Sequence, residues 1–297
     1  MADLHIPGDW LTLRGELVAG PSAVLAVGGS DSGKSALCRW LAAEWAQEGQ
    51  ACWLVDSDVG QSQLGPPATV GCAPLGPGGT PEATAFLVGD VSPRRALPQM
   101  LGVLAEAVRT AREAGAERMV VDTTGWTTGP EAVALKVAKT AILGEAHVVL
   151  IEREDELRAF RRAWRGLARF PLHLLRPVPE VRRRPPEERR AHREGAFRAH
   201  LEGAVECEID LGRVAALGIG ALHLPRPSVP TGLLLGLNDA RGRLLSLGIL
   251  QRLDAASGRL RCLCRAEGAG AVEVRFGRLL IDPDGTHASV ADAEGTP

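Results

Sequence analysis

Residues 23–35 read Ala-Val-Leu-Ala-Val-Gly-Gly-Ser-Asp-Ser-Gly-Lys-Ser, and this stretch decides the fold. Its first five residues are apolar and predict a buried strand. The next eight, Gly28 to Ser35, fit the pattern G-x-x-x-x-G-K-[ST]. Apolar side chains then recur at helical spacing from Ser35 to Gln47, which predicts a helix. A strand, a glycine-rich loop and a helix in this order predict a phosphate-binding loop of the P-loop class.

Each part of this loop has a physical role in holding a nucleoside triphosphate. Glycines let backbone N–H groups turn toward phosphate oxygens, and the positive end of the following helix points at them. The Lys34 ammonium is expected to reach the β- and γ-phosphates, and the Ser35 hydroxyl to bind Mg²⁺. The other residues expected to line the nucleotide are Gly29, Ser30, Asp31, Ser32, Gly33 and Ala36.

A second apolar run, residues 51–55, ends in the acidic segment Asp56-Ser57-Asp58-Val59-Gly60-Gln61. Residues two apart on an extended segment share a face, so the carboxylates at 56 and 58 are expected to point the same way. Carboxylates in this place hold Mg²⁺ through water or accept a proton from a nucleophile. The Gln61 amide is expected to orient a water or a phosphate oxygen.

A third apolar run, Arg118 to Val121, ends at Asp122. An apolar strand followed by Asp is typical of the Walker B arrangement, which places a carboxylate near Mg²⁺. Asp122, Asp56 and Ser35 are therefore the expected metal contacts, partly through water. Two alternatives stay open: Asp122 is the main contact and Asp56 only structural, and Trp126 packs in the core instead of stacking on a ligand.

The rest of the chain predicts an α/β fold with a second, β-rich part. Strands at 85–89 and 147–151 alternate with helices over 98–114 and 131–143, which predicts a parallel sheet flanked by helices. Ligands gather at the carboxyl ends of such strands. From about Ser228, four apolar runs separated by turn residues predict a small antiparallel domain, followed after Pro283 by a loose tail. The expected organisation is an N-terminal segment (1–22), a P-loop domain (23–225) and a C-terminal β-rich domain (226–297).

Charge is distributed unevenly along the chain. The net charge is −2, yet fourteen Arg and only seven Asp or Glu lie between Arg153 and Arg198. This excess predicts a positive surface that faces an anionic ligand. Lysine, in contrast, occurs only at positions 34, 136 and 139.

Neither a signal peptide nor a membrane span is expected, since no apolar run approaches the ~20 residues of a spanning helix. Six cysteines are scattered, and Cys262 and Cys264 are expected to be alternate residues of a strand. These features predict a protein of the reducing cytoplasm that does not bind a membrane.

The run from Val27 to Gly71 resembles the polynucleotide 5′-hydroxyl kinase family, as a prokaryotic member. That family joins a P-loop to an Asp-Val-Gly-Gln segment about two dozen residues later, and here Lys34 and Asp58 are 24 positions apart. The segment from Thr123 to Trp126 looks like the family's Thr-x-Gly-Trp clasp. The family's arginine-rich lid helix is matched at about 180–203 by these residues: Arg184, Arg189, Arg193, Phe197 and Gly203.

The resemblance implies transfer of the γ-phosphate of ATP, with Mg²⁺, to the 5′-hydroxyl end of RNA or DNA in RNA processing. Asp58 would be the general base, while Lys34 and the lid residues Arg189 and Arg193 would neutralise the transferred phosphoryl group. The other residues implied at the nucleotide are Thr124, Gly125, Trp126, Arg184 and Gln61. The chain departs from the family in two respects. About twenty residues stand where the eukaryotic forms carry an N-terminal β-rich domain, and Asp122 stands where the family often has Asn or another residue.

Other functions remain compatible with these motifs. A P-loop switch ATPase or GTPase would use the same loop, although no Asn-Lys-x-Asp motif is present and the single Asn is Asn238. A small-molecule kinase would also use a basic lid, and an ATP-binding scaffold in RNA processing needs only the loop. The lid arginines themselves have an ordinary alternative as a solvated basic helix paired with Glu187, Glu188 and Glu194.

Overall fold

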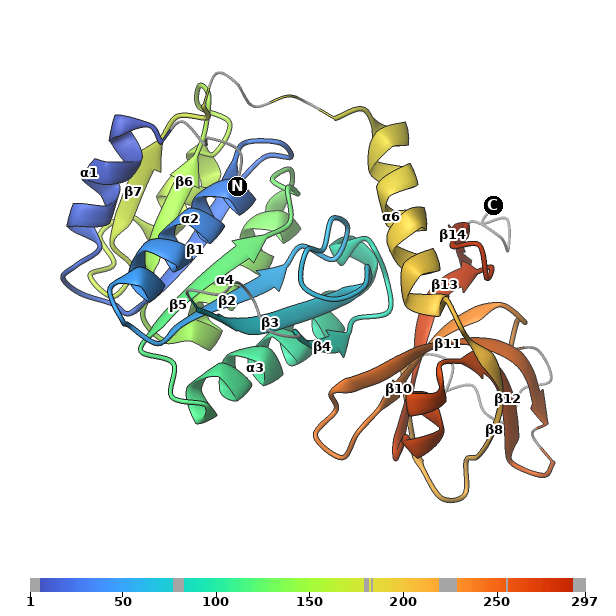
Figure 1. Cartoon of the computed structure of the whole chain (residues 1–297). Helices are drawn as coiled ribbons and strands as arrows, with labels where there is room; N and C mark the ends of the chain where they lie inside the picture. Colours follow the sequence, from blue (N-terminus) through green and yellow to red (C-terminus); the bar gives the residue numbers. More distant parts are fainter. Residues whose placement is uncertain are drawn as a thin grey trace. The chain divides into compact units, whose positions relative to one another are not determined.

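The computed structural model describes residues 6–76, 83–178, 182, 184–218, 229–254 and 256–290. It divides into two compact units (Figure 1). The first unit contains residues 1–58, 71–83 and 100–184, and the second contains 59–70, 84–99 and 185–297. The chain therefore leaves the first unit twice before it enters α6 (Pro186–Leu201).

The first unit is built on a mostly parallel sheet. Its strands lie in the order β3-β2-β5-β1-β6-β7, and all neighbours are parallel except β3, which is antiparallel to β2. The strands are β1 (Ala23–Gly28), β2 (Cys52–Ser57), β3 (Thr69–Leu75), β5 (Arg118–Thr123), β6 (His147–Ile151) and β7 (Leu172–Leu175). The predicted α/β class is confirmed, and the antiparallel β3 and the short β7 are additions to it.

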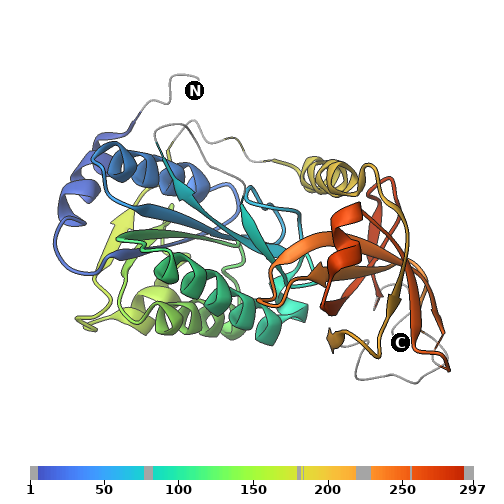
Figure 2. The same ribbon diagram turned by 60° about the horizontal axis from the view of Figure 1, so that its bottom comes forward.

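Helices cover both faces of this sheet. Figure 2 shows the blue α2 on one side and the green α3 and α4 on the other. The helices of this part of the chain are α1 (Gly8–Glu16), α2 (Lys34–Gln47), α3 (Leu97–Glu113), α4 (Pro130–Leu143) and α5 (Arg158–Trp164). The N-terminal segment thus contains a helix that was not predicted. Trp10 of α1 packs on Trp40 of α2, with ring centroids 5.5 Å apart, and this contact holds the helix to the unit.

The second unit holds an antiparallel sheet in the order β14-β13-β10-β11-β12-β8, with β9 added in parallel beside β13. The strands of this sheet are β8 (Val205–Asp210), β9 (Ala215–Gly218), β10 (Leu233–Asn238), β11 (Leu244–Asp254), β12 (Arg259–Cys264), β13 (Glu273–Ile281) and β14 (His287–Ser289). The residues of β4 (Thr84–Leu87) are also assigned to the second unit, but β4 is not a strand of this sheet. The 3₁₀ turns η1 (Pro93–Arg95) and η3 (Ala266–Gly270) also lie in the described part of this unit. The four predicted apolar runs are confirmed as β10 to β13.

Two expectations about this unit need comment. The boundary expected between residues 225 and 226 lies outside the described residues, but β8 and β9, which precede it, belong to the second sheet. The loose tail expected after Pro283 is wrong over its described part. Residues 287–289 form β14, because they pair with β13 in antiparallel register. The buried His287 ring also packs on the Phe197 ring of α6 at a centroid distance of 5.3 Å.

Segment 84–99 is anchored in the second unit by a glycine pair. Gly89 has a φ of +87°, and a Cβ built on it would lie 2.8 Å from the Cα of Gly277 in β13. Arg278 N donates to the Gly89 carbonyl oxygen at 2.8 Å. Leu87 joins a buried cluster with Phe197 and Leu234. Because both backbones must touch, side chains are excluded at the glycine positions.

The described helices include none with both the length and the apolar character needed to cross a bilayer. All six cysteines are free thiols. Cys262 and Cys264 are buried, alternate residues of β12, as predicted, and they pack in the core of the second sheet beside Cys207.

Candidate nucleotide and phosphoryl-transfer site

The glycine-rich loop joins β1 to α2 with two residues in the left-handed backbone region. Gly33, immediately before the helix, has a φ of +93°, and Asp31 has a φ of +52°. Glycine adopts this conformation freely, and aspartate tolerates it. The Lys34 ammonium donates to the Gly29 carbonyl oxygen at 2.6 Å, so the loop curls around it. Lys34 is only 5% exposed. The loop therefore presents a concave backbone and a buried cation, as phosphate binding requires.

The predicted clasp segment lies against this loop. A Cβ built on Gly125 would lie 2.6 Å from both the Cα and the backbone N of Ser30, which is closer than real Cβ contacts. Only glycine allows this approach at position 125. Thr124 is buried, whereas Trp126 is only half-buried. The structure thus brings Ser30, Thr124 and Gly125 together, and Trp126 is not a core residue.

Strands β2 and β5 are neighbours, and their register places Asp56 beside Asp122. Burial raises the pKa of the Asp122 carboxyl, while the Lys34 ammonium and a hydrogen bond from the Ser35 hydroxyl oppose that rise. The Asp56 carboxylate accepts a hydrogen bond from Asp58 N at 2.9 Å. Asp56 therefore stabilises the turn that carries Asp58, while Asp122 contacts the P-loop serine directly.

Asp58 belongs to the same group of charges. Its carboxylate raises the pKa of Asp122 and opposes the lowering of the pKa of two buried lysines on α4. These effects decay with distance, so Asp58 lies within electrostatic reach of Asp122. Lys34, Asp122 and Asp58 thus form one charged cluster at the carboxyl ends of the strands, as the sequence predicts.

The two lysines of α4, Lys136 and Lys139, were not predicted as site residues. Both are fully buried. Lys136 Nζ donates to the carbonyl and hydroxyl oxygens of Thr124 at 2.8 and 2.9 Å, and Lys139 Nζ donates to Ser57 Oγ at 2.7 Å. Burial lowers the pKa of both, in Lys139 to about 8. All three lysines of the chain therefore lie at this site, and the rarity of lysine was the sequence signal.

The remaining predicted residues divide between the two units. In the first unit, Arg184 N and Nε donate to the Asp31 carboxylate at 3.1 and 3.3 Å, which places Arg184 at the loop. In the second unit, Gln61 Nε2 donates to the carbonyl oxygen of Arg189 at 3.2 Å, and Arg193 Nε lies 3.5 Å from His287 Nε2. Both lid arginines thus belong to α6. Their contacts join this helix to Gln61 and to β14.

The first unit has the donor set that Mg²⁺ prefers with a nucleotide. Among the described residues, no three His, Cys, Asp or Glu side chains converge as a metal site. Mg²⁺ beside a nucleotide typically takes one or two carboxylates and completes its shell with phosphate oxygens and water. The hydrogen-bonded pair of Ser35 and Asp122 fits this requirement.

Comparisons of the sequence with known proteins identify a family and several relatives. The family model described as "mRNA cleavage and polyadenylation factor CLP1 P-loop" matches residues 28–203. A polyribonucleotide 5′-hydroxyl-kinase of Thermococcus kodakarensis is 27% identical over 320 residues, which cover 89% of this chain and 90% of that protein. One of Pyrococcus horikoshii is 25% identical, with 92% and 90% covered.

A solved structure of wild-type Clp1p in complex with Pcf11p has the same fold. It superposes with a TM-score of 0.66 at 12% identity and covers 90% of this chain and 76% of that one.

Proposed function

The chain belongs to the CLP1 P-loop family, and we propose that it is an ATP-dependent polynucleotide 5′-hydroxyl kinase acting on RNA. The observation that carries this proposal is the single cluster of Lys34, Asp122 and Asp58 in the first unit. It offers a cation for the terminal phosphate, a carboxylate for Mg²⁺ and a further carboxylate for the acceptor. The names of the archaeal relatives support RNA as the polymer.

Asp58 is proposed as the general base. Its carboxylate takes the proton of the 5′-hydroxyl as the oxygen forms a bond to the γ-phosphorus of ATP. The bond from that phosphorus to the β–γ bridging oxygen breaks, and ADP leaves with the bond's electron pair. Loop N–H groups and Lys34 hold the phosphates in line, while Ser35 and Asp122 would hold Mg²⁺, which neutralises the phosphate charge when bound.

The clasp and the lid are proposed to complete the site. Thr124 and Gly125 support the loop that holds the phosphates, and Trp126 is proposed to cover them. Arg189 and Arg193 are proposed to stabilise the transferred phosphoryl group. In P-loop enzymes, an arginine supplied in this way accelerates transfer by about 10³–10⁵.

The proposal is tested by following the γ-phosphate. The protein is incubated with γ-labelled ATP, Mg²⁺ and matched RNA and DNA oligonucleotides that end in a 5′-hydroxyl. We expect label on the RNA end, and none on the same RNA that already carries a 5′-phosphate. Labelled inorganic phosphate without labelled oligonucleotide would identify a nucleotide switch instead. Label on nucleosides alone would identify a small-molecule kinase. ATP that is bound but not cleaved would identify an ATP-binding scaffold.

A further inference from the structure

The first unit has a second basic feature, a hollow beside α5 and β7. Its volume is about 740 Å³, within the range of ligand sites in proteins. We call it the α5 hollow. It is lined by Arg158, Arg161, Arg162, Arg165, Leu172 and Leu174. None of them belongs to the P-loop, the acidic cluster or the clasp, so the proposed mechanism does not use this hollow.

Helix α5 carries three of these arginines, and the fourth, Arg165, is the residue at which the helix ends. Positions 158, 161, 162 and 165 recur at the spacing of one helical face. The opposite face is anchored by Phe160 and Trp164, whose rings are buried, and Trp164 Nε1 donates to Thr140 Oγ1 at 3.1 Å. From the first to the last arginine the stripe spans about 10 Å by the helical rise. It therefore presents a preformed row of guanidinium groups rather than one isolated charge.

Most of this positive charge has no anion from the protein itself. Arg161 pairs with Glu152 at 2.8 Å and with Asp155, which fixes the start of the helix. The side chains of Arg158, Arg162 and Arg165 make no ion pair or hydrogen bond within the described part of the chain. Three neighbouring cations that have no counter-charge among the described residues concentrate positive potential, which attracts a polyanion.

The floor of the hollow is apolar. Leu172 and Leu174 are alternate residues of β7 and share a face of the strand. Leu174 is 53% exposed. Arginines that bind phosphates, next to an apolar surface for riboses or bases, suit a nucleic acid strand better than a simple anion.

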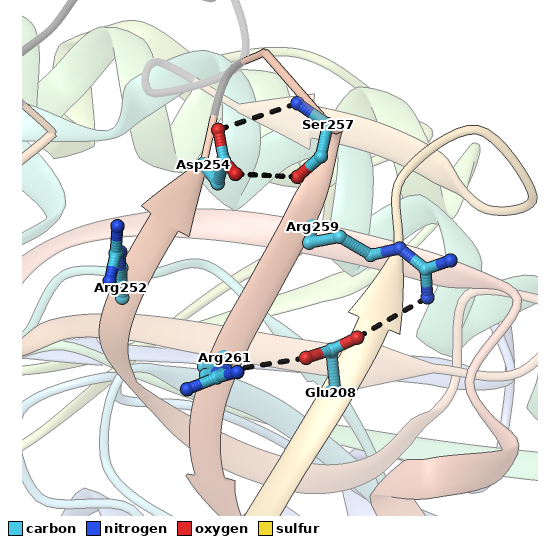
Figure 3. A pocket seen from close by; sticks show the side chains of 6 residues that line it. All are labelled: Glu208, Arg252, Asp254, Ser257, Arg259 and Arg261. Atoms are coloured by element: carbon cyan, nitrogen blue, oxygen red, sulfur yellow. Dashed lines mark hydrogen bonds and ion pairs between the residues drawn. The ribbon is translucent and has the colours of Figure 1, made fainter.

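A hollow in the second unit contains arginines whose charge is neutralised by carboxylates of the protein itself (Figure 3). It measures about 290 Å³ and also contains three arginines. Here, however, the Glu208 carboxylate accepts hydrogen bonds from Arg259 and Arg261 at 3.3 and 3.2 Å, and Asp254 lies in the same lining. Protein carboxylates already occupy the place that an external phosphate would take.

We propose that the α5 hollow binds backbone phosphates of the polynucleotide substrate at a distance from its reacting 5′ end. The inference rests on the proposed function, since it supplies that kinase with a second contact to a polymer. Binding energy from a non-reacting part of a substrate helps to position the reacting group. Charge contacts of this kind weaken as salt rises, because each one releases counterions.

The test compares two acceptors and two double variants. R158A/R162A removes unpaired charge from the α5 hollow and keeps the structural Arg161, while R259A/R261A removes the same charge from the second unit. The acceptors are a single-stranded 5′-hydroxyl RNA of about 20 nucleotides, longer than a typical single-strand site, and a nucleoside 3′-monophosphate. For R158A/R162A we expect the KM of the RNA to rise about 10-fold and the salt slope of RNA binding to fall by about 2. Its kcat, and the KM of the mononucleotide, should not change.

Each other outcome has a defined meaning. A wild-type KM for RNA in R158A/R162A, or an equal rise in R259A/R261A, would overturn the α5 hollow as a specific site and leave the kinase proposal intact. If the wild-type protein transfers no phosphate, the proposed function fails, and fluorescence anisotropy of labelled RNA still compares the variants. Polyglutamate is a second ligand for the same comparison. If R158A/R162A loses binding to polyglutamate but binds RNA like wild type, the surface is a site for an acidic protein, and the inference is contradicted. Circular dichroism melting checks that both variants are folded.

Discussion

Two residues are central to the proposed site, Asp58 through its carboxylate and Gly125 through its close backbone contact. Asp58 lies in the charged cluster with Lys34 and Asp122, and Asp56 holds its backbone N–H. Gly125 lies so close to Ser30 that a side chain cannot enter. The first feature concerns proton transfer, and the second concerns the shape of the phosphate site, so they predict different defects.

Asp58→Asn should reduce transfer while ATP still binds. The amide cannot accept a proton, and general-base catalysis contributes about 10²–10⁴-fold to rate. We expect kcat to fall by about that factor, with the dissociation constant of ATP within about 3-fold of wild type, as measured by labelled transfer and by calorimetry. A near-normal kcat in this variant would refute the base assignment.

Gly125→Ala should weaken nucleotide binding. The new methyl would meet Ser30 backbone atoms at 2.6 Å, so the P-loop must move. We expect ATP affinity to fall about 10-fold or more, as overpacking typically costs about 1–3 kcal/mol. Gly102→Ala is the matched control, because a Cβ there meets nothing within 4 Å. Equal ATP affinity in the two variants would show that the contact with the loop is unimportant.

At the element scale, α4 ties together the ends of two strands. Its Lys139 holds Ser57 at the end of β2, and its Lys136 holds Thr124 just after β5. Helix α4 therefore fixes the segments that follow β2 and β5, which carry Asp58 and Gly125 of the proposed site. Single-sequence patterning identified α4 as a helix, but it could not identify these bonds, since they join residues 82 and 12 positions apart.

Lys139 should also give the fold a measurable pH dependence. Its pKa is lowered from 10.5 to about 8 in the folded protein, so the unfolded chain binds more protons between those values. The contribution of Lys139 to the free energy of unfolding should therefore increase as pH rises from about 8 to about 10.5, by at most about 1.4 kcal/mol per pH unit. Denaturant unfolding at several pH values gives the free energy of unfolding of wild type and of Lys139→Met. Across this window that free energy should rise with pH more steeply in wild type than in the variant. Parallel stability curves would contradict the lowered pKa. Burial raises the pKa of cysteine thiols in both proteins, which lowers the free energy of unfolding as pH rises. Only the difference between the two pH dependences therefore reports on Lys139.

At the scale of the whole molecule, the motifs of the proposed site are shared between two units. Asp58 ends a segment of the first unit and Val59 begins one of the second, while Arg184 and Pro185 are divided in the same way. Arg189 and Arg193 lie in the second unit on α6.

Arg189→Ala should slow transfer more than it weakens ATP binding, because the proposed contact is with charge that moves in the transition state. We expect kcat to fall about 10²-fold or more, with the dissociation constant of ATP changed about 3-fold or less. Arg198→Ala on the same helix, which bonds to the Asp284 carbonyl oxygen, is the control. A matching loss in both variants would indicate that α6 acts only through its fold.

Local sequence predicted those parts of the molecule whose signals are local. The P-loop has its motif, the strands that contain Asp56 and Asp122 are continuous apolar runs, and strands β10 to β13 are apolar-rich runs separated by turn residues. The strands β9 and β14 do not, because they are short and their stability comes from partners distant in sequence. Strand β8 did carry a signal that was not used: apolar and acidic residues alternate over Val205–Asp210. Helix α1 had a signal in the spacing of Trp10, Leu13 and Leu17, all buried, that was weaker than the P-loop pattern beside it.

The role of Asp58 as the base is tested most directly by a crystal structure with Mg²⁺, a non-hydrolysable ATP analogue and an RNA that ends in a 5′-hydroxyl. We expect the 5′-oxygen at about 2.6–3.2 Å from the Asp58 carboxylate and in line with the γ-phosphorus held by Lys34. An Asp58 side chain turned away from the γ-phosphate, or protein atoms filling the place of the 5′-hydroxyl, would contradict it.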